Sequence, residues 1–194
     1  MPRRVDHEVR KRQITDAVVR ITVQGGLPAV TFREVAAEAG VSVRLVQYYF
    51  GTKDQLLLDT QRHVAEHSVA RIRRLLDRAG DTPRDILRAI MRSFVPTDDE
   101  SRTAMLMYIA LFTASLVDPS LRRKEATEVP ASMRHEFTAH LRRARLRAGV
   151  DPDSEALLLM FTVTGLSQGV LAGQVTPADA FKTIDYTLDR AIRP

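Results

Sequence analysis

Residues 31–50 read Thr31-Phe32-Arg33-Glu34-Val35-Ala36-Ala37-Glu38-Ala39-Gly40-Val41-Ser42-Val43-Arg44-Leu45-Val46-Gln47-Tyr48-Tyr49-Phe50. Thr31 and Glu34 have the spacing of a capping box, in which a hydroxyl and a carboxylate each bind a backbone N–H left free at a helix start. Gly40 interrupts the first apolar segment, and Ser42 is a good N-cap for a second helix over residues 43–50. The sequence therefore predicts two short helices joined by a tight turn.

A glycine-containing turn between two short amphipathic helices is typical of a helix-turn-helix motif. In this motif the first helix supports the second, whose outer face enters the major groove of DNA. On that face Arg44 is suited to guanine edges, Gln47 to adenine edges and Val43 to a thymine methyl group. The side chains suited to phosphates are Thr31, Tyr48, Tyr49 and Lys53. A helical hairpin that serves only for packing is the alternative interpretation.

Apolar side chains recur at helical spacing through nearly the whole chain, and no segment shows the sustained alternation of a half-buried strand. The sequence therefore predicts an all-α fold. Besides the two short helices, we expect helices over residues 8–24, 53–78, 84–94, 99–117, 120–148, 153–173 and 177–192. A break near Pro130 is left open within the fifth of these segments, residues 120–148. The chain is expected to divide in function near residue 55.

The composition is that of a globular protein, with 44% hydrophobic and 27% charged residues in a chain of 194. Cysteine is absent, which excludes disulfides, thiolate metal sites and thiol nucleophiles. The charged segment 1–12 lacks the apolar core of a secretory signal, so we expect a cytoplasmic protein.

The positive charge is concentrated in the first part of the chain. The net charge is +5, and residues 1–55 hold 9 basic and 6 acidic side chains. A polyanion would therefore meet this part first, although such an excess is also found on ordinary solvated surfaces. The basic residues of the N-terminal arm, suited to tracking phosphates or entering a minor groove, are Arg3, Arg4, Arg10, Lys11 and Arg12. A disordered, solvated tail is the alternative.

Several segments together resemble the N-terminal domain of the tetracycline-repressor (TetR) family over about residues 10–57. They are Gln13-Ile14, Gly25-Gly26, Ala29-Val30-Thr31-Phe32-Arg33-Glu34-Val35-Ala36, Ala39-Gly40-Val41-Ser42 and Tyr48-Tyr49-Phe50-Gly51-Thr52-Lys53-Asp54-Gln55-Leu56. The resemblance implies an all-helical homodimer. It implies a three-helix DNA-binding domain at residues 1–55, and a helical bundle at residues 56–194 that binds a small molecule and dimerises.

The resemblance also implies which residues contact DNA. It places Arg33, Arg44, Leu45, Tyr49 and Lys53 where members of the family contact DNA. Gln47 occupies a position at which many members carry a phosphate-contacting tyrosine. Whether Gln47 contacts a base or a phosphate, or Tyr48 takes over the phosphate contact, stays open.

The C-terminal part offers two further candidate sites. The adaptable or aromatic residues that we expect to line a ligand pocket are Met91, Phe94, Met105, Tyr108, Phe112, Phe137 and Phe161. For each of them a place in the closed core is the alternative. Gly165, Gly169 and Gly173 recur every four residues, so we expect them to clear one helix face for a dimer interface. Packing within the subunit is the alternative for these glycines.

Three patterns suggest other activities. His63-Val64-Ala65-Glu66-His67 spells a zinc-peptidase motif, and Gly165-Leu166-Ser167-Gln168-Gly169 spells the nucleophile elbow of hydrolases. We interpret both as chance matches, because no further ligand set supports the first and no strand or downstream histidine supports the second. Residues 156–178 carry no charge, but polar residues interrupt this segment. We therefore expect no catalytic residue, metal, cofactor or membrane contact.

Taken together, these features predict a ligand-responsive, DNA-binding transcriptional regulator. We expect a repressor that a small-molecule effector releases from a near-palindromic DNA operator. The alternative is a helical small-molecule-binding enzyme or carrier that does not bind DNA.

Overall fold

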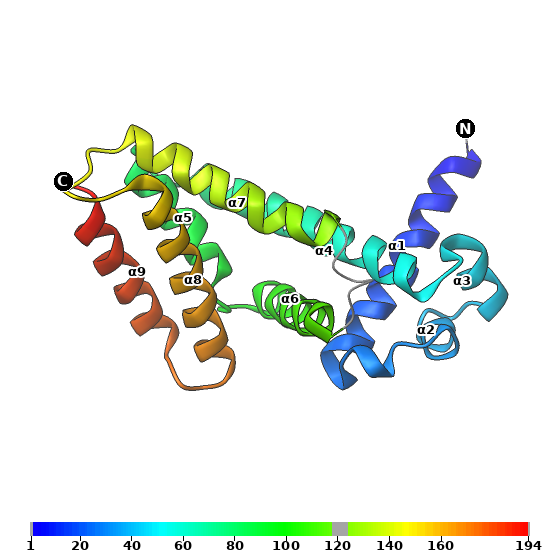
Figure 1. Ribbon diagram of the computed structural model, residues 1–194. Coiled ribbons are helices and arrows are strands. Elements are labelled where there is room, and N and C mark those ends of the chain that lie inside the picture. Colours follow the sequence, from blue (N-terminus) through cyan, green and yellow to red (C-terminus); the bar gives the residue numbers. More distant parts are fainter. Residues whose placement is uncertain (1, 118–123, 194) are drawn as a thin grey trace. The chain divides into compact units, whose positions relative to one another are not determined.

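The computed structural model describes residues 2–117 and 124–193, and within these ranges the chain is helical without a strand (Figure 1). The α-helices are α1 (Pro2–Gly25), α2 (Phe32–Glu38), α3 (Val43–Phe50), α4 (Lys53–Leu76), α5 (Pro83–Phe94), α6 (Asp99–Val117), α7 (Lys124–Arg143), α8 (Pro152–Leu171) and α9 (Pro177–Ala191). A short 3₁₀ helix, η1 (Leu27–Ala29), follows α1. The all-α prediction is confirmed.

The described residues form two compact units. Unit 1 comprises residues 2–67 and 106–117, and unit 2 comprises residues 68–105 and 124–193. Helices α4 and α6 each contribute residues to both units. The functional boundary at residue 55 stays a prediction, because the division into units follows packing and not function.

Unit 1 has a core made by one face of each of its first helices. The fully or nearly buried side chains of this core include Ile14 and Val18 from α1, Val35 from α2, Val46 and Phe50 from α3, and Leu56 from α4. The short helices begin where the caps predict: Thr31 Oγ1 accepts from the Glu34 N–H at 3.1 Å, and Ser42 Oγ accepts from the Leu45 N–H at 3.2 Å. Gly40 has a φ of +63°, which side-chain-bearing residues rarely adopt, and so allows the tight turn between α2 and α3.

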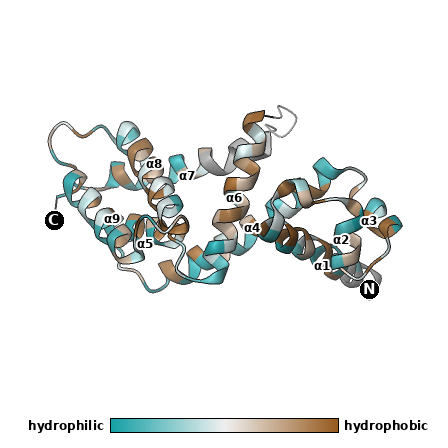
Figure 2. Cartoon of the chain, turned by 90° about the horizontal axis from the view of Figure 1, so that it is seen from below, coloured by the Kyte–Doolittle hydropathy of each residue, from teal (hydrophilic) through white to brown (hydrophobic). Residues whose placement is uncertain are grey.

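Unit 2 has its own core between α5, α7, α8 and α9. Its fully buried side chains include Leu87, Met91, Phe137, Leu141, Leu159, Ile184 and Leu188. Three of these helices start with a capping residue followed by proline, at Thr82-Pro83, Asp151-Pro152 and Thr176-Pro177. Buried residues recur every three or four positions along α9, at Ala180, Ile184, Leu188 and Ala191, and both brown and teal residues colour this helix in Figure 2. Helix α9 therefore buries one side.

Three predicted helix ends were wrong. Helix α7 ends at Arg143 and not near residue 148, because the chain after it pairs with the end of α9: the Arg147 N–H donates to the Ala191 carbonyl at 2.9 Å. Helix α7 also includes Pro130 without a break. Helix α8 ends at Leu171, which leaves Gly173 in the following turn, and α1 begins at Pro2 rather than near residue 8.

Candidate nucleic-acid interface

The outer face of α3 presents adjacent side chains to solvent. Val43, Arg44, Gln47 and Tyr48 are exposed, and Tyr48 keeps 76% of its surface accessible. Val46 is fully buried on the opposite face of the helix. The face combines a guanidinium, an amide, a phenol and a small apolar group, which is a suitable set for reading base edges and phosphates.

The remaining predicted DNA contacts surround this face. Thr31 and Arg33 at the start of α2 and Lys53 at the start of α4 are exposed. Leu45 and Tyr49 are half-buried. The Tyr49 ring packs edge-on against His7, with 4.5 Å between ring centroids, and against Tyr48 at 5.5 Å. Because both neighbours are aromatic, Tyr49 is restrained more than a surface tyrosine.

Helix α1 supports the turn of the motif through a contact that sequence reasoning missed. The Gln13 Nε2 amide donates to the Ala39 carbonyl oxygen at 2.7 Å, which joins α1 to the residue before Gly40. Arg20 forms an ion pair with Glu38 at 2.5 Å, which joins α1 to the end of α2. The partners lie 26 and 18 residues apart, so local sequence carries no signal for either contact.

Lys53 stands at the first residue of α4, where free N–H groups and the helix dipole favour an anion. Its Nζ donates to the Leu27 carbonyl at a distance of 3.4 Å, which is long for a hydrogen bond. Thr52 caps the same turn by accepting from the Gln55 N–H at 3.2 Å. An incoming phosphate would therefore compete with only one weak contact for the Lys53 ammonium.

Two cations of the predicted N-terminal arm bind within unit 1. Arg10 donates to the Gln13 side chain at 2.7 Å, and Lys11 forms an ion pair with Asp59 at 3.2 Å. Residues Arg3 and Arg4 belong to α1, but their side chains lie outside the described part of the structure. A disordered tail is therefore wrong for the described residues from Pro2 onward, which are helical.

The predicted pocket residues are not equivalent in the structure. Met91 and Phe137 are fully buried in the core of unit 2, Met105 is nearly buried, and Phe94 packs at the edge of that core. Phe161 is 71% exposed. Tyr108 and Phe112, in unit 1, stack with 5.8 Å between ring centroids, and burial raises the pKa of the Tyr108 hydroxyl. Met91 and Phe137 would meet a ligand only if the core of unit 2 opened.

The three predicted interface glycines also differ. Gly165 is exposed, and a Cβ there would meet no atom within 4 Å. Gly169 is buried against Val175, whose Cγ2 would lie 3.0 Å from such a Cβ. Gly173 lies outside α8 with a φ of +70°. The expected single face of three helical glycines is therefore wrong, and only Gly165 lies open on the surface of α8.

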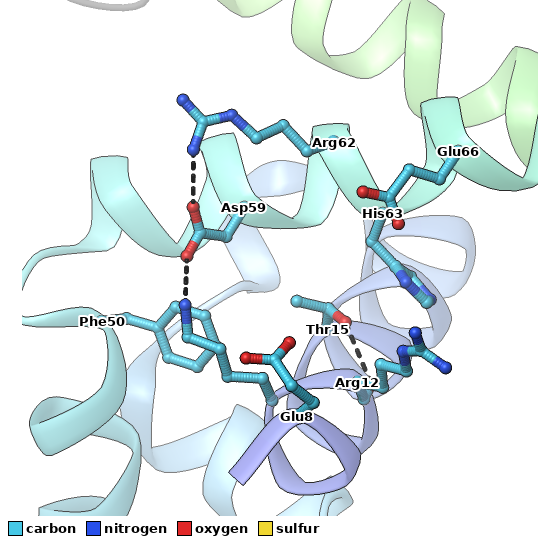
Figure 3. Close-up of a pocket in the computed structure, with 9 residues that line it drawn as sticks. Glu8, Arg12, Thr15, Phe50, Asp59, Arg62, His63 and Glu66 are labelled. Atoms are coloured by element: carbon cyan, nitrogen blue, oxygen red, sulfur yellow. Dashed lines mark hydrogen bonds and ion pairs between the residues drawn. The ribbon is translucent and has the colours of Figure 1, made fainter. Parts of the chain in front are cut away.

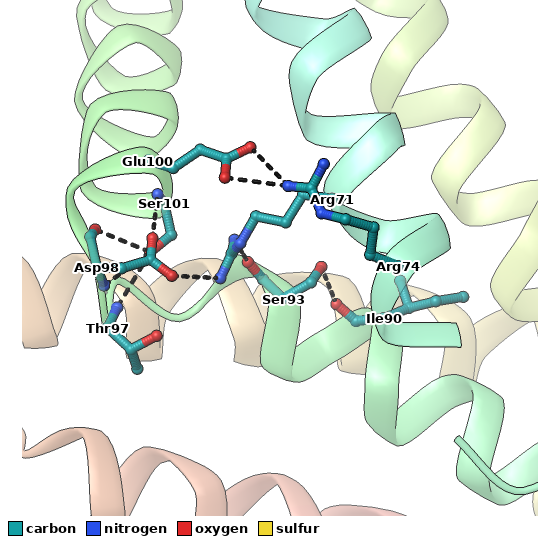
Figure 4. Close-up of polar contacts among 8 residues, drawn as sticks. All are labelled: Arg71, Arg74, Ile90, Ser93, Thr97, Asp98, Glu100 and Ser101. Carbon is teal, nitrogen blue, oxygen red and sulfur yellow. Dashed lines mark hydrogen bonds and ion pairs between the residues drawn. The ribbon is translucent and has the colours of Figure 1, made fainter. Parts of the chain in front are cut away.

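A polar cluster in unit 2 joins the last turns of α4 to the connection between α5 and α6 (Figure 4). The Arg71 guanidinium donates to the Ser93 carbonyl and lies 3.5 Å from Asp98. Asp98 accepts from both the N–H and the hydroxyl of Ser101 at 2.7 Å, and these bonds, helped by Arg71, hold its pKa below the ordinary value. Arg74 pairs with Glu100 at 3.2 Å. Helix α4 is thus tied to the start of α6.

The zinc-peptidase and nucleophile-elbow patterns take part in contacts within the fold. The His63 imidazole binds Asp16 at 2.7 Å and lies edge-on to His67, and the described residues contain no group of three or more potential metal ligands. Ser167 is buried within α8 and donates to the Val163 carbonyl at 2.7 Å, so it does not stand on a strand-to-helix turn. Helix α8 has the length and apolarity of a membrane span, and it packs one set of buried residues, which includes Ala156, Leu159 and Val163, in the core with α7 and α9.

Comparison with known proteins accounts for both parts of the chain. A model of bacterial regulatory proteins of the TetR family matches residues 14–60, and a model of the C-terminal part of BetI-type transcriptional repressors matches residues 83–193. The HTH-type transcriptional regulator BetI of Burkholderia mallei is 32% identical over 201 residues, covering 100% of this chain and 99% of the relative. The chain belongs to the TetR family of transcriptional regulators. Within that family its C-terminal part is of the BetI type.

Solved TetR-family structures share the fold. A putative TetR-family regulator from Rhodococcus sp. superposes with a TM-score of 0.82 at 22% identity, covering 94% of this chain and 98% of the other. A putative transcriptional regulator from Saccharomonospora viridis, solved in complex with choline, gives 0.83 at 19% identity and covers 95% and 98%. These structures show the shared fold. The family models and the BetI relatives make the chain a DNA-binding transcriptional regulator of a family in which ligand-responsive repression is typical. The alternative of an enzyme or carrier without DNA binding receives no support.

Proposed function

We propose that this TetR-family chain is a cytoplasmic repressor that binds a near-palindromic operator as a homodimer and leaves it when a small molecule binds. The proposal rests on the exposed face of α3, where Arg44 and Gln47 lie side by side. The turn before this helix is bound to α1 by Gln13. Arg44 and Gln47 read base edges, while Thr31, Tyr48, Tyr49 and Lys53 hold phosphates. The proposed repressor acts by binding alone and performs no catalysis.

Dimerisation is assigned to α8 and α9. Leu158, Phe161 and Gly165 follow one another at intervals of three and four residues, so they share one face of α8. Leu158 is 56% exposed, and Tyr186 on α9 is 63% exposed. Apolar side chains exposed in a group favour an interface. A second copy of the chain would cover this face across a twofold axis, with Gly165 allowing close approach of the two backbones.

Coupling between effector and operator is assigned to α4. This helix carries Lys53 at its start and Arg71 near its end, and Arg71 binds the α5–α6 connection. An effector that displaces the start of α6 therefore acts on α4 through Arg71 and Asp98. Because coupling between two binding sites is reciprocal, operator DNA lowers effector affinity by the same factor.

The effector is a small organic molecule bound by the C-terminal part. Choline is the first probe to use, because a structural neighbour holds it. The proposal is tested by selecting bound sites from random duplexes and adding choline and related ammonium compounds to the complex. An inverted repeat is expected among the selected sites. Selected duplexes without a repeat, or no enrichment at all, would contradict the proposal.

A further inference from the structure

Asp59 is a carboxylate held between two helices of unit 1. It lies on α4, and its side chain is only 16% exposed. It accepts from Lys11 Nζ of α1 at 3.2 Å, from Gln55 Nε2 at 2.8 Å and from Arg62 Nη1 at 3.3 Å. Figure 3 shows the Asp59 carboxylate facing the Arg62 guanidinium. A largely buried carboxylate with three donors has one preferred position, so it fixes its partners.

Lys11 extends this contact to the recognition helix. Its Nζ lies 5.7 Å from the ring centroid of Phe50, the last residue of α3. Phe50 is only 3% exposed, so the ring packs against neighbours on most sides. A cation over an aromatic face is attracted to it, and more strongly where water is partly excluded. Asp59 therefore orients the cation that contacts the end of α3.

Asp59 and Lys11 lie beside a hollow between α1 and α4. A hollow of about 280 Å³ lies here, lined by Glu8, Lys11, Arg12, Thr15, Phe50, Asp59, Arg62, His63 and Glu66 (Figure 3). Ile14, Val18 and Leu56 belong to one apolar core that α1 and α4 share, and at the hollow charged side chains bridge the two helices in addition. A second bridge, Asp16 to His63 at 2.7 Å, lies one turn further along α4. These pairs thus add polar contacts to the apolar packing of α1 and α4.

We propose that Asp59 is a positioning residue for operator recognition, which it serves by holding Lys11 against Phe50 and so fixing the end of α3. The inference rests on the proposed function, in which α3 reads base pairs. Base-edge contacts tolerate only small displacements, whereas attraction to phosphates does not depend on fine geometry. Loss of the Asp59 charge should therefore reduce discrimination between sequences more than it reduces binding to DNA in general.

The test compares Asp59→Asn with the wild-type chain on two duplexes of equal length, a selected site and a scrambled one. We expect affinity for the selected site to fall about tenfold. Affinity for the scrambled duplex should stay equal or rise, because the variant carries one negative charge fewer. Both affinities are measured on the active fraction, found by stoichiometric titration, so a loss of folded protein does not change their ratio.

Glu66→Gln is the matched control. Glu66 is exposed on the same helix and lines the same hollow, so this variant removes the same charge from the same region. Its affinity ratio should equal that of the wild type. An equal fall for Glu66→Gln, or an unchanged ratio for Asp59→Asn, would overturn the inference.

Lys11→Met provides a second measurement that does not depend on the folding of Asp59→Asn. It should lower the same ratio, and the double variant should be little worse than either single one, because both remove one contact. Additive losses would overturn the inference. A wild-type chain that fails to discriminate between any two duplexes would instead overturn the proposed function, on which this inference depends.

Discussion

The Gln13 side-chain amide lies 2.7 Å from the Ala39 carbonyl oxygen and donates to it. Ala39 is nearly buried and directly precedes the glycine of the turn, so its carbonyl has little access to water. Gln13 therefore supplies a hydrogen bond that fixes the turn between α2 and α3 against α1. The bond thus adds a long-range contact to a turn in which Gly40 has a positive φ.

Gln13→Leu should destabilise the protein by about 1–3 kcal/mol, because it leaves a buried carbonyl without a donor. Chemical denaturation monitored by circular dichroism measures this change. Gln24→Leu is the control, since Gln24 is an exposed residue of the same helix. Equal unfolding free energies for the Gln13 variant and the wild type would show that the bond does not stabilise the turn.

Lys53→Ala should weaken binding to all duplexes by a similar factor, because a phosphate contact carries no sequence information. Because two chains bind each duplex, loss of one phosphate contact per chain should also reduce the slope of log affinity against log salt by about 1.8. Fluorescence anisotropy at several salt concentrations measures both effects. Arg134→Ala, which removes an exposed cation of α7, should leave the slope as it is. If the Lys53 variant showed the same salt slope as the wild type, Lys53 would not contact a phosphate.

Arg44→Ala should relax the sequence preference at one base position in each half-site, at a cost of about 1–3 kcal/mol for the preferred base. The reason is that a guanidinium on the exposed face of α3 can bind two acceptors of a guanine edge. Selection from random duplexes, repeated with the variant, measures the preference. Unaltered preferences at every position would count against direct reading by Arg44.

His140 should make the protein sensitive to acid. Its side chain is only 14% exposed and its Nδ1 is buried without a partner, and burial, aided by Arg143 against the opposing effect of Glu136, lowers its pKa. The unfolded chain therefore binds a proton more readily than the folded one. Stability is complete above the unfolded pKa of about 6.5 and declines as the pH falls through the lower, folded pKa.

His140→Gln should reduce this decline, since glutamine stays neutral. Thermal unfolding midpoints at neutral pH and near pH 5 measure the difference, and His135→Gln, which changes an exposed histidine of α7, serves as the control. If the His140 variant lost as much stability on acidification as the wild type, another group would be responsible.

Capping and helix-ending residues in the sequence predicted the bounds of α3 well. Ser42 and Gly51 mark the two ends of α3, so its bounds Val43–Phe50 follow from neighbouring residues alone. The end of α7 was not predictable in this way, because the segment after Arg143 is drawn into pairing with residues 191–193. Long-range contacts of this kind leave no pattern in the nearby sequence.

For the candidate site residues, too, the sequence predicted exposure but not long-range contacts. The exposure of Arg44 and Gln47 followed from helical spacing, whereas the supporting contacts of Gln13 and Asp59 join residues 26 and 48 positions apart. Apolar residue type did not distinguish a pocket wall from closed core, as the complete burial of Met91 and Phe137 shows. The roles of these residues in binding stay predictions.

Sedimentation of the chain with a labelled selected duplex tests the central claim most directly, because it reports association and stoichiometry together. Two chains should sediment with each duplex, and the complex should dissociate steeply as salt rises. A chain that remains single in dilute solution and binds no duplex at low ionic strength would contradict the account.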